Sequence, residues 1–201
     1  MKILGLTGQS GAGKGVVASL FAQHGIPAVD ADAVYHELLI PPSPCLDELR
    51  AEFSDAILNA DGTLNRPALS ALVFAPTDEG TARLRRLNGI THRYVIEKTV
   101  AMLEEYEKSG CRAAIIDAPL LIEAGLHRKC DHVIAVLADR EVRVARLLQR
   151  DPLSIEQISA RLDAQRDASF YMEHADMLIY NNGTIDELKA SVCSLISEVL
   201  A

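Results

Sequence analysis

The chain has 201 residues, of which 49% are hydrophobic and 24% charged, and these values exclude a disordered or fibrous protein and fit one globular domain. Its 20 basic and 28 acidic residues give a formal charge of -8, which disfavours broad nucleic-acid binding and leaves room only for a local basic patch. The four cysteines stand singly without zinc spacing, and no apolar run approaches the ~18 residues of a membrane span, so we expect a cytoplasmic protein with no membrane partner.

The first predicted elements are a short buried strand, residues 2–6, a glycine-rich loop and a helix that ends before Gly25. The loop, Gly8-Gln9-Ser10-Gly11-Ala12-Gly13-Lys14, matches G-x-x-x-x-G-K, the phosphate-binding loop (P-loop), in the strand–loop–helix context that the motif requires. In such a loop main-chain N–H groups surround an anion and the lysine reaches the outer phosphates. The residues predicted to bind a nucleotide here are Gly8, Ser10, Gly11, Ala12, Gly13, Lys14, Gly15 and Val16.

The position after Lys14 departs from the motif. Ser or Thr is usual there, but this chain has Gly15 followed by Val16, so no hydroxyl is available to ligate Mg²⁺ directly. Because Mg²⁺ commonly keeps several waters, we hypothesise that it is held through waters, the nucleotide phosphates and the carboxylates of Asp32 or Asp117.

Acidic residues follow the next two predicted strands. Residues 26–29 end at Asp30-Ala31-Asp32, and Asp32 is the candidate base for a phosphoryl acceptor, expected to project from the carboxyl edge of the sheet towards the phosphates. A helix cap is the alternative for either aspartate. Residues 113–116 end at Asp117, a candidate Mg²⁺ ligand, for which the alternative is a turn residue before Pro119.

A fourth strand, residues 132–137, leads into an arginine-rich segment. Arg143, Arg146 and Arg150 fall at i, i+3 and i+7, one helical face suited to close over polyphosphate. The alternative is a solvated face paired with nearby acids. Arg161 and Arg166, on the next predicted helix, are expected at the surface.

A fifth strand, residues 177–180, stops at Asn181-Asn182-Gly183 and precedes a final amphipathic helix. The strands are continuous apolar runs that alternate with helices, which predicts an α/β fold with a five-stranded parallel sheet flanked by helices. We expect one domain, 1–201, with its core in residues 1–36, 111–139 and 173–201. Residues 37–110, helical by pattern, and 140–172 are expected to be insertions over the carboxyl ends of the strands.

Together, these residues make nearly the whole chain resemble the dephospho-CoA kinase family. The resemblance rests on motifs in a specific order, namely Gly5-Leu6-Thr7 before the P-loop, Asp30-Ala31-Asp32, residues 61–66 with Leu69 and Val73-Phe74, Asp117-Ala118-Pro119-Leu120-Leu121 with Glu123, Arg146, Gln149-Arg150, Gln165, Ala175-Asp176 and Asn181-Asn182-Gly183. Besides Gly15, the chain departs from the family pattern at His92-Arg93, where His-Pro is usual, and at Asn65-Arg66, where Asp-Arg is usual.

The resemblance implies a P-loop kinase fold and the ATP-dependent phosphorylation of the ribose 3′-hydroxyl of dephospho-CoA, the last step of coenzyme A synthesis, with Mg²⁺ as cofactor. It implies that 37–110 is an acceptor-binding insertion and 140–172 an arginine-bearing lid. The residue roles it implies fall into three groups: catalytic Asp32, Lys14 and Arg146; ATP-binding Arg146, Arg150 and Asn181; and acceptor-binding Asp32, Tyr35, Arg66, His92 and Leu120.

Two alternatives stay open. One is a nucleoside or nucleotide kinase with the same core and another acceptor. The other is a nucleotide-binding regulator or inactive homologue, because Gly15 lacks the P-loop hydroxyl. The sequence does not indicate the oligomeric state.

Overall fold

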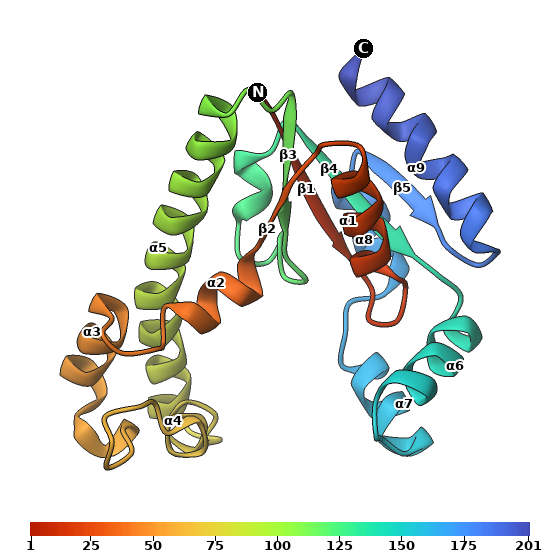
Figure 1. The fold of residues 1–201 in the computed structure, drawn as a ribbon. Coiled ribbons are helices and arrows are strands. Elements are labelled where there is room, and N and C mark those ends of the chain that lie inside the picture. The colour runs from red at the N-terminus through yellow and green to blue at the C-terminus, as the bar shows by residue number, and fades with distance from the viewer. The chain divides into compact units, whose positions relative to one another are not determined.

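The computed structural model describes residues 1–201 and contains a five-stranded sheet in the order β2-β3-β1-β4-β5 (Figure 1). Its strands are β1 (Lys2–Gly8), β2 (Ala28–Asp30), β3 (Ala113–Asp117), β4 (His132–Leu137) and β5 (Met177–Tyr180). β1 pairs in parallel with β3 and β4, and β4 pairs in parallel with β5. The predicted α/β fold with a parallel sheet is confirmed.

The register of β1 determines what lies beside the start of the P-loop. Leu6 is opposite Asp117 on β3, and Gly8 is opposite Val136 on β4. Because parallel strands end at the same edge of a sheet, the carboxylate of Asp117 and the P-loop share that edge.

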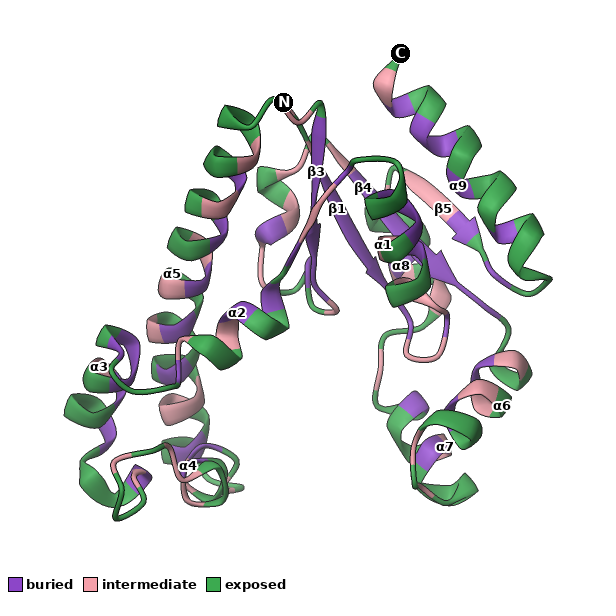
Figure 2. Cartoon of the chain, in the orientation of Figure 1, coloured by how far each residue is buried: buried purple, intermediate pink, exposed green.

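Helices cover both faces of the sheet. On one face α1 (Lys14–Gln23) and α9 (Ile185–Leu200) pack together, and their apolar side chains form the main core with β1, β3 and β4. On the other face Tyr171 of α8 (Ala168–His174) packs with Ala135 and Leu137 of β4. Figure 2 shows the strands largely buried and the helices buried along one side only. The continuous apolar strands therefore follow from cover on both faces.

The chain divides into two compact units, residues 1–29 with 103–201, called here the first unit, and residues 30–102, the second. The first unit contains the sheet and further short helices, η2 (Leu126–Lys129), α6 (Arg140–Arg150) and α7 (Ile155–Asp163). The second is helical, with α2 (Ala31–Glu37), α3 (Pro44–Phe53), η1 (Asp55–Ile57), α4 (Arg66–Val73) and much of the 31-residue α5 (Asp78–Lys108). Its own core includes Leu49, Ile57 and Leu69.

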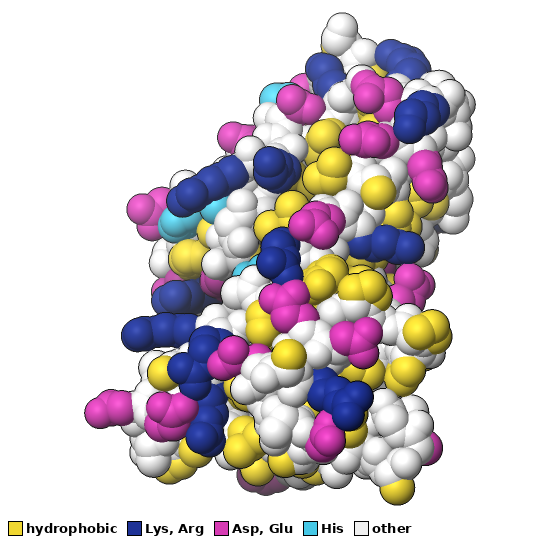
Figure 3. Space-filling model, turned by 90° about the vertical axis from the view of Figure 1, so that its left-hand side faces the viewer, with side chains coloured by type: hydrophobic (Ala, Val, Ile, Leu, Met, Phe, Trp, Pro, Cys, Tyr) yellow, Lys and Arg dark blue, Asp and Glu magenta, His cyan; other side chains and the backbone are white.

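Ion pairs join α3 and α5 in the second unit. Arg86 contacts Glu52 at 2.7 Å, and Arg93 pairs with Glu48. On the face drawn in Figure 3, basic and acidic side chains are interspersed among hydrophobic ones. In neither unit is any helix both long enough and apolar enough to cross a bilayer.

Candidate active site

The P-loop conformation requires glycine at two positions where no other residue type fits. Gly8 and Gly13 have φ values of 151° and 98°. A Cβ on Gly8 would overlap the carbonyl of Val136, and one on Gly13 would overlap Nδ2 of Asn181. The loop can therefore pass close to β4 and to Asn181 only because Gly8 and Gly13 have no side chains.

Several main-chain N–H groups of the loop are left for a ligand. Ala12 donates to Gln9 O at 3.0 Å, and Ser10 donates to Oε1 of Gln165 at 3.1 Å. The N–H groups of Gly11, Gly13, Lys14 and Gly15 donate to no acceptor within the chain. Because they sit at the N-terminus of α1, they form a site suited to an anion.

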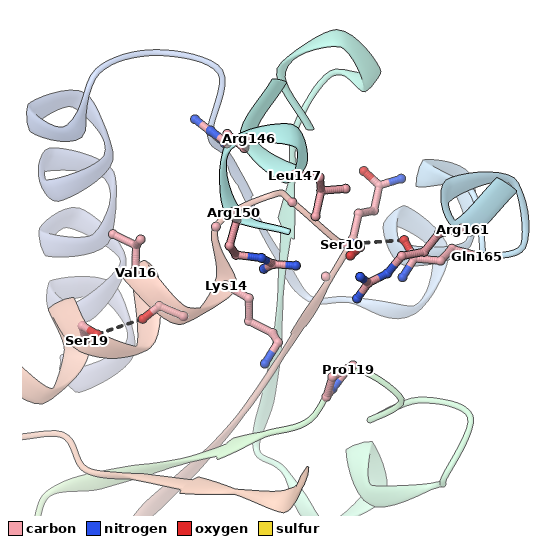
Figure 4. Close-up of a pocket in the computed structure, with 15 residues that line it drawn as sticks. Ser10, Lys14, Val16, Ser19, Pro119, Arg146, Leu147, Arg150, Arg161 and Gln165 are labelled. Atoms are coloured by element: carbon pink, nitrogen blue, oxygen red, sulfur yellow. Dashed lines mark hydrogen bonds between the residues drawn. The ribbon is translucent and has the colours of Figure 1, made fainter. Parts of the chain in front are cut away.

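A cavity of about 640 Å³ adjoins the loop. Four cationic side chains line it, namely Lys14, Arg146, Arg150 and Arg161. In Figure 4 the side chains of Arg150 and Arg161 point toward each other near Lys14, with Gln165 beside Arg161, whereas the side chain of Arg146 points away from them. The cavity thus combines free N–H donors with positive charge, the combination that polyphosphate requires.

Asp151 organises two of these cations. It accepts hydrogen bonds from Arg150 Nε at 2.6 Å and from Arg161 Nη1 at 3.0 Å. The hydrogen bond with Arg150 lowers the pKa of Asp151 and raises that of Arg150. Arg161, expected only at the surface, is exposed and also lines the cavity. Its ion pair with Asp151 joins residues ten positions apart, so helical spacing does not predict it.

Lys14 forms an ion pair with Asp117 within the first unit. Asp117 is only 7% exposed, and Thr7, next to Gly8, donates its hydroxyl to Pro119 O at 3.0 Å. The predicted phosphate-binding lysine and the predicted metal ligand are thus brought together at the carboxyl edge of β1 and β3.

The structure corrects the prediction for Arg143. With Leu147, it lies on the buried side of α6, is 8% exposed and does not line the cavity. Burial lowers the pKa of its guanidinium, and its Nε has no hydrogen-bond partner. The i, i+3, i+7 pattern wrongly placed Arg143 on the cavity side, because Arg143 and Leu147, at i and i+4, face inward. Only Arg146 and Arg150 of this pattern line the cavity.

Asn181 lies behind the loop. Its Nδ2 donates to Ala12 O at 2.8 Å, and its Oδ1 accepts from Arg146 Nη2 at 3.4 Å. Arg146 Nη1 also donates to Ala12 O at 3.4 Å. The side chains of two residues predicted to contact ATP are thus bonded to the P-loop itself.

Four of the predicted acceptor residues belong to the second unit. Asp32 is exposed in the first turn of α2, whose N-cap is Asp30, which confirms the cap alternative for Asp30. Burial raises the pKa of Tyr35, an effect that the charge of Arg66 opposes. Arg66 Nη2 lies 3.0 Å from Nδ1 of His36, a neighbour that sequence reasoning missed.

The remaining acceptor candidates are both exposed. His92 lies on α5 in the second unit, whereas Leu120 follows Pro119 in the first unit and is 62% exposed. No group of three or more His, Cys, Asp or Glu side chains is placed to hold a metal ion.

A glycine-rich loop between β1 and α1, at the carboxyl edge of a parallel sheet and beside a cation-lined cavity, defines a P-loop kinase. Comparison with known families gives the particular group. The dephospho-CoA kinase family model matches residues 2–187, and the chain belongs to this family.

Relatives of known family agree with that assignment, and two solved structures have a similar fold. The chain is 38% identical to the dephospho-CoA kinase of Corynebacterium efficiens over 98% of its length and 96% of the relative's, and 39% identical to that of Corynebacterium glutamicum over 98% and 97%. The structure of TT1252 from Thermus thermophilus is similar with a TM-score of 0.80, 29% identity and coverage of 98% and 97%. The dephospho-CoA kinase from Campylobacter jejuni has the same fold, with a TM-score of 0.70, 24% identity and coverage of 99% and 98%.

Proposed function

We propose that this chain transfers the γ-phosphoryl group of ATP to the ribose 3′-hydroxyl of dephospho-CoA, giving coenzyme A and ADP. The observation that carries the proposal is the cation-lined cavity at the P-loop in a chain that belongs to the dephospho-CoA kinase family. The reaction needs positioning and charge neutralisation more than covalent chemistry, and these are what the cavity supplies.

Each nucleotide-binding group has a distinct task. The loop N–H groups hold phosphate oxygens through hydrogen bonds in a fixed geometry, and Lys14 adds a mobile point charge. Arg146 and Arg150 neutralise the charge that spreads over the transferred group. Arg161 joins them, since Asp151 ties its guanidinium to the same side of the cavity.

On the acceptor side, we assign Asp32 as the base that takes the proton of the attacking hydroxyl. Asp32 is exposed on α2, and its carboxylate accepts no hydrogen bond from the rest of the chain. The carboxylate is therefore available to a substrate. Tyr35, Arg66 and His92 are proposed acceptor contacts from the second unit, and Leu120 is one from the first.

Mg²⁺ is the proposed cofactor. Asp117 offers a carboxylate, the donor type that this hard cation prefers, beside Lys14, whereas Gly15 offers no hydroxyl. Asp117, with the nucleotide phosphates and waters, would then hold the ion, which neutralises phosphate charge when bound, and Asp32 is the alternative carboxylate for this role. Restoring the hydroxyl with Gly15→Ser should lower the Mg²⁺ concentration for half-maximal activity, and an unchanged concentration would contradict this assignment.

Mass-spectrometric identification of the product with ATP and dephospho-CoA tests the proposed function. ADP release should occur with dephospho-CoA and not with AMP or adenosine. Turnover with AMP alone would instead identify a nucleotide kinase. If no acceptor is phosphorylated at any Mg²⁺ concentration, the chain is a nucleotide-binding homologue without activity.

A further inference from the structure

Asn181 supports the P-loop from outside the cavity. It directly follows β5, its main-chain N–H donates to Leu137 O at 2.8 Å, and it is only 6% exposed. Its carboxamide contacts the fully buried Ala12, yet Asn181 does not line the cavity, whereas Gly13 does. The sheet edge therefore holds this side chain rigidly against the back of the loop.

The partners of the carboxamide determine its orientation. Ala12 O can only accept a hydrogen bond, and the guanidinium of Arg146 can only donate one. Nδ2 must therefore face Ala12 O, and Oδ1 must face Arg146, as the 2.8 Å and 3.4 Å contacts show. The Asn181–Ala12 bond is the shorter of the two and has nearly ideal length.

Fixing one carbonyl also fixes the next N–H. In a trans peptide the C=O of one residue and the N–H of the following residue point in opposite directions. The bond from Asn181 to Ala12 O therefore directs the N–H of Gly13 away from Asn181, to the side of the loop where the cavity lies. This N–H donates to no acceptor in the chain and is free for a phosphate oxygen.

The loop would not hold this peptide by itself. Gly13 has a left-handed conformation, and glycine rotates between conformations more easily than any other residue. Rotation of the Ala12–Gly13 peptide would turn a carbonyl oxygen towards the phosphates, which repel it. A buried carboxamide at Ala12 O opposes that rotation before a nucleotide arrives.

We propose that Asn181 is a positioning residue for phosphoryl transfer, which locks the Ala12–Gly13 peptide so that the Gly13 N–H faces the phosphates, and which orients Arg146 through its Oδ1. The proposal rests on the proposed function. It replaces the expected contact between Asn181 and ATP with an action through the loop. Both bonds of Arg146 are 3.4 Å long, so this guanidinium can move to a phosphate while Asn181 keeps the loop in place.

The test separates phosphate binding from nucleoside binding. Calorimetry measures the affinity of Asn181→Ala for tripolyphosphate with Mg²⁺ and, separately, for adenosine. Asn182→Ala is the matched control, because this neighbouring asparagine is exposed and its Oδ1 accepts from Asp139 N at 2.8 Å, away from the loop. Asn181→Asp keeps the shape but loses the donor, and Asn182→Asp controls for its added charge.

We expect both Asn181 variants to lose about tenfold in tripolyphosphate affinity relative to their matched controls, with adenosine affinity unchanged. kcat should fall more than KM for the acceptor rises. Tripolyphosphate affinity equal to that of the controls would overturn the proposal, and so would equal losses for tripolyphosphate and adenosine. Phosphate binding that depends on Asn181, without phosphorylation of dephospho-CoA, would refute the proposed function and the role of Asn181 in transfer, but would support its lock on the Ala12–Gly13 peptide.

Discussion

Gly13 and Gly15 stand two residues apart, yet the structure constrains only one of them. A Cβ on Gly13 would overlap Asn181, and its φ of 98° is one that L residues rarely adopt. A Cβ on Gly15 would meet nothing within 4 Å, and the residue lies in the first turn of α1. The two glycines should therefore respond oppositely to the same substitution.

Gly13→Ala is expected to destabilise the fold and to abolish measurable ATP binding, because the loop must shift away from Asn181. Gly15→Ala should stabilise the chain by about 0.5–1 kcal/mol, since alanine loses less conformational entropy in a helix. Urea unfolding and calorimetry with ATP measure both effects. Equal destabilisation by the two variants would show that the loop tolerates no side chain at either position.

Asp32→Ala should lower kcat by about 10²–10⁴-fold, because a general base acts mainly in the transition state. ATP affinity should stay within about twofold. The exposed Glu37 at the other end of α2 provides a matched control as Glu37→Gln, with unchanged kcat. A loss of ATP affinity in Asp32→Ala would reassign Asp32 from proton transfer to holding the metal.

Two helices begin with the same capping arrangement but different charge. In α9, Glu187 Oε2 accepts from Thr184 N at 2.6 Å and from its hydroxyl at 3.0 Å, and these hydrogen bonds lower the pKa of Glu187. In α7 the neutral Gln157 accepts from Ser154 N at 2.9 Å. Of these two caps, only that of α9 depends on the ionisation of its glutamate.

Because the pKa of Glu187 is lowered in the folded state, its contribution to stability is present above the usual carboxyl pKa of about 4.3 and is lost as pH falls through the lowered value. Glu187→Gln should therefore unfold at lower urea concentration than the wild type at pH 7, and this difference should shrink as pH falls below the usual carboxyl pKa. Gln157→Ala should show a difference that does not shrink in this way. A pH-independent effect of Glu187→Gln would mean that its charge does not support the cap.

Among the elements, those with uninterrupted apolar runs were the best predicted. β4 and β5 match the expected residues, whereas β2 begins two residues later than expected, because Ile26 and Pro27 precede its ladder. The helices of the second unit were expected only as a helical segment, since Ser43 and Asn65 begin α3 and α4 through caps that one sequence does not distinguish from loop residues.

In the site too, some residues could be predicted from the sequence and others could not. Residues within the P-loop motif could be predicted because their spacing is local. The roles of Asn181 at Ala12, Gln165 at Ser10 and Arg161 at Asp151 could not be derived from spacing, because these contacts depend on how distant segments pack. The strand order was likewise beyond the sequence, since all five apolar runs look alike.

Each unit has a cysteine that reports on its core, Cys45, which is buried, and Cys130, which is partly buried. Burial raises the pKa of Cys45, in the second unit, to about 11 and that of Cys130, in the first, to about 12. Both thiols should therefore be alkylated slowly at pH 8, because only the thiolate reacts.

Leu49 is 0% exposed in the core of the second unit, so Leu49→Ala should destabilise that unit by about 2–5 kcal/mol. We expect faster alkylation of Cys45 and an unchanged rate at Cys130, measured by mass spectrometry of peptides. Conservative Leu49→Met should leave both rates close to those of the wild type. Equal acceleration at both cysteines would show that the two cores open as one cooperative body.

The hydrogen bond between Ser10 and Gln165 has a consequence for how tightly any phosphate is held. The Ser10 N–H already donates to Oε1 of Gln165, so a phosphate oxygen that accepts from this N–H must displace the glutamine amide. Every measured affinity at this loop is therefore a net exchange energy. Because Gln165 lies between α7 and α8, we expect its displacement also to release that connection from the P-loop, so that occupancy of the loop changes the mobility of residues 164–167.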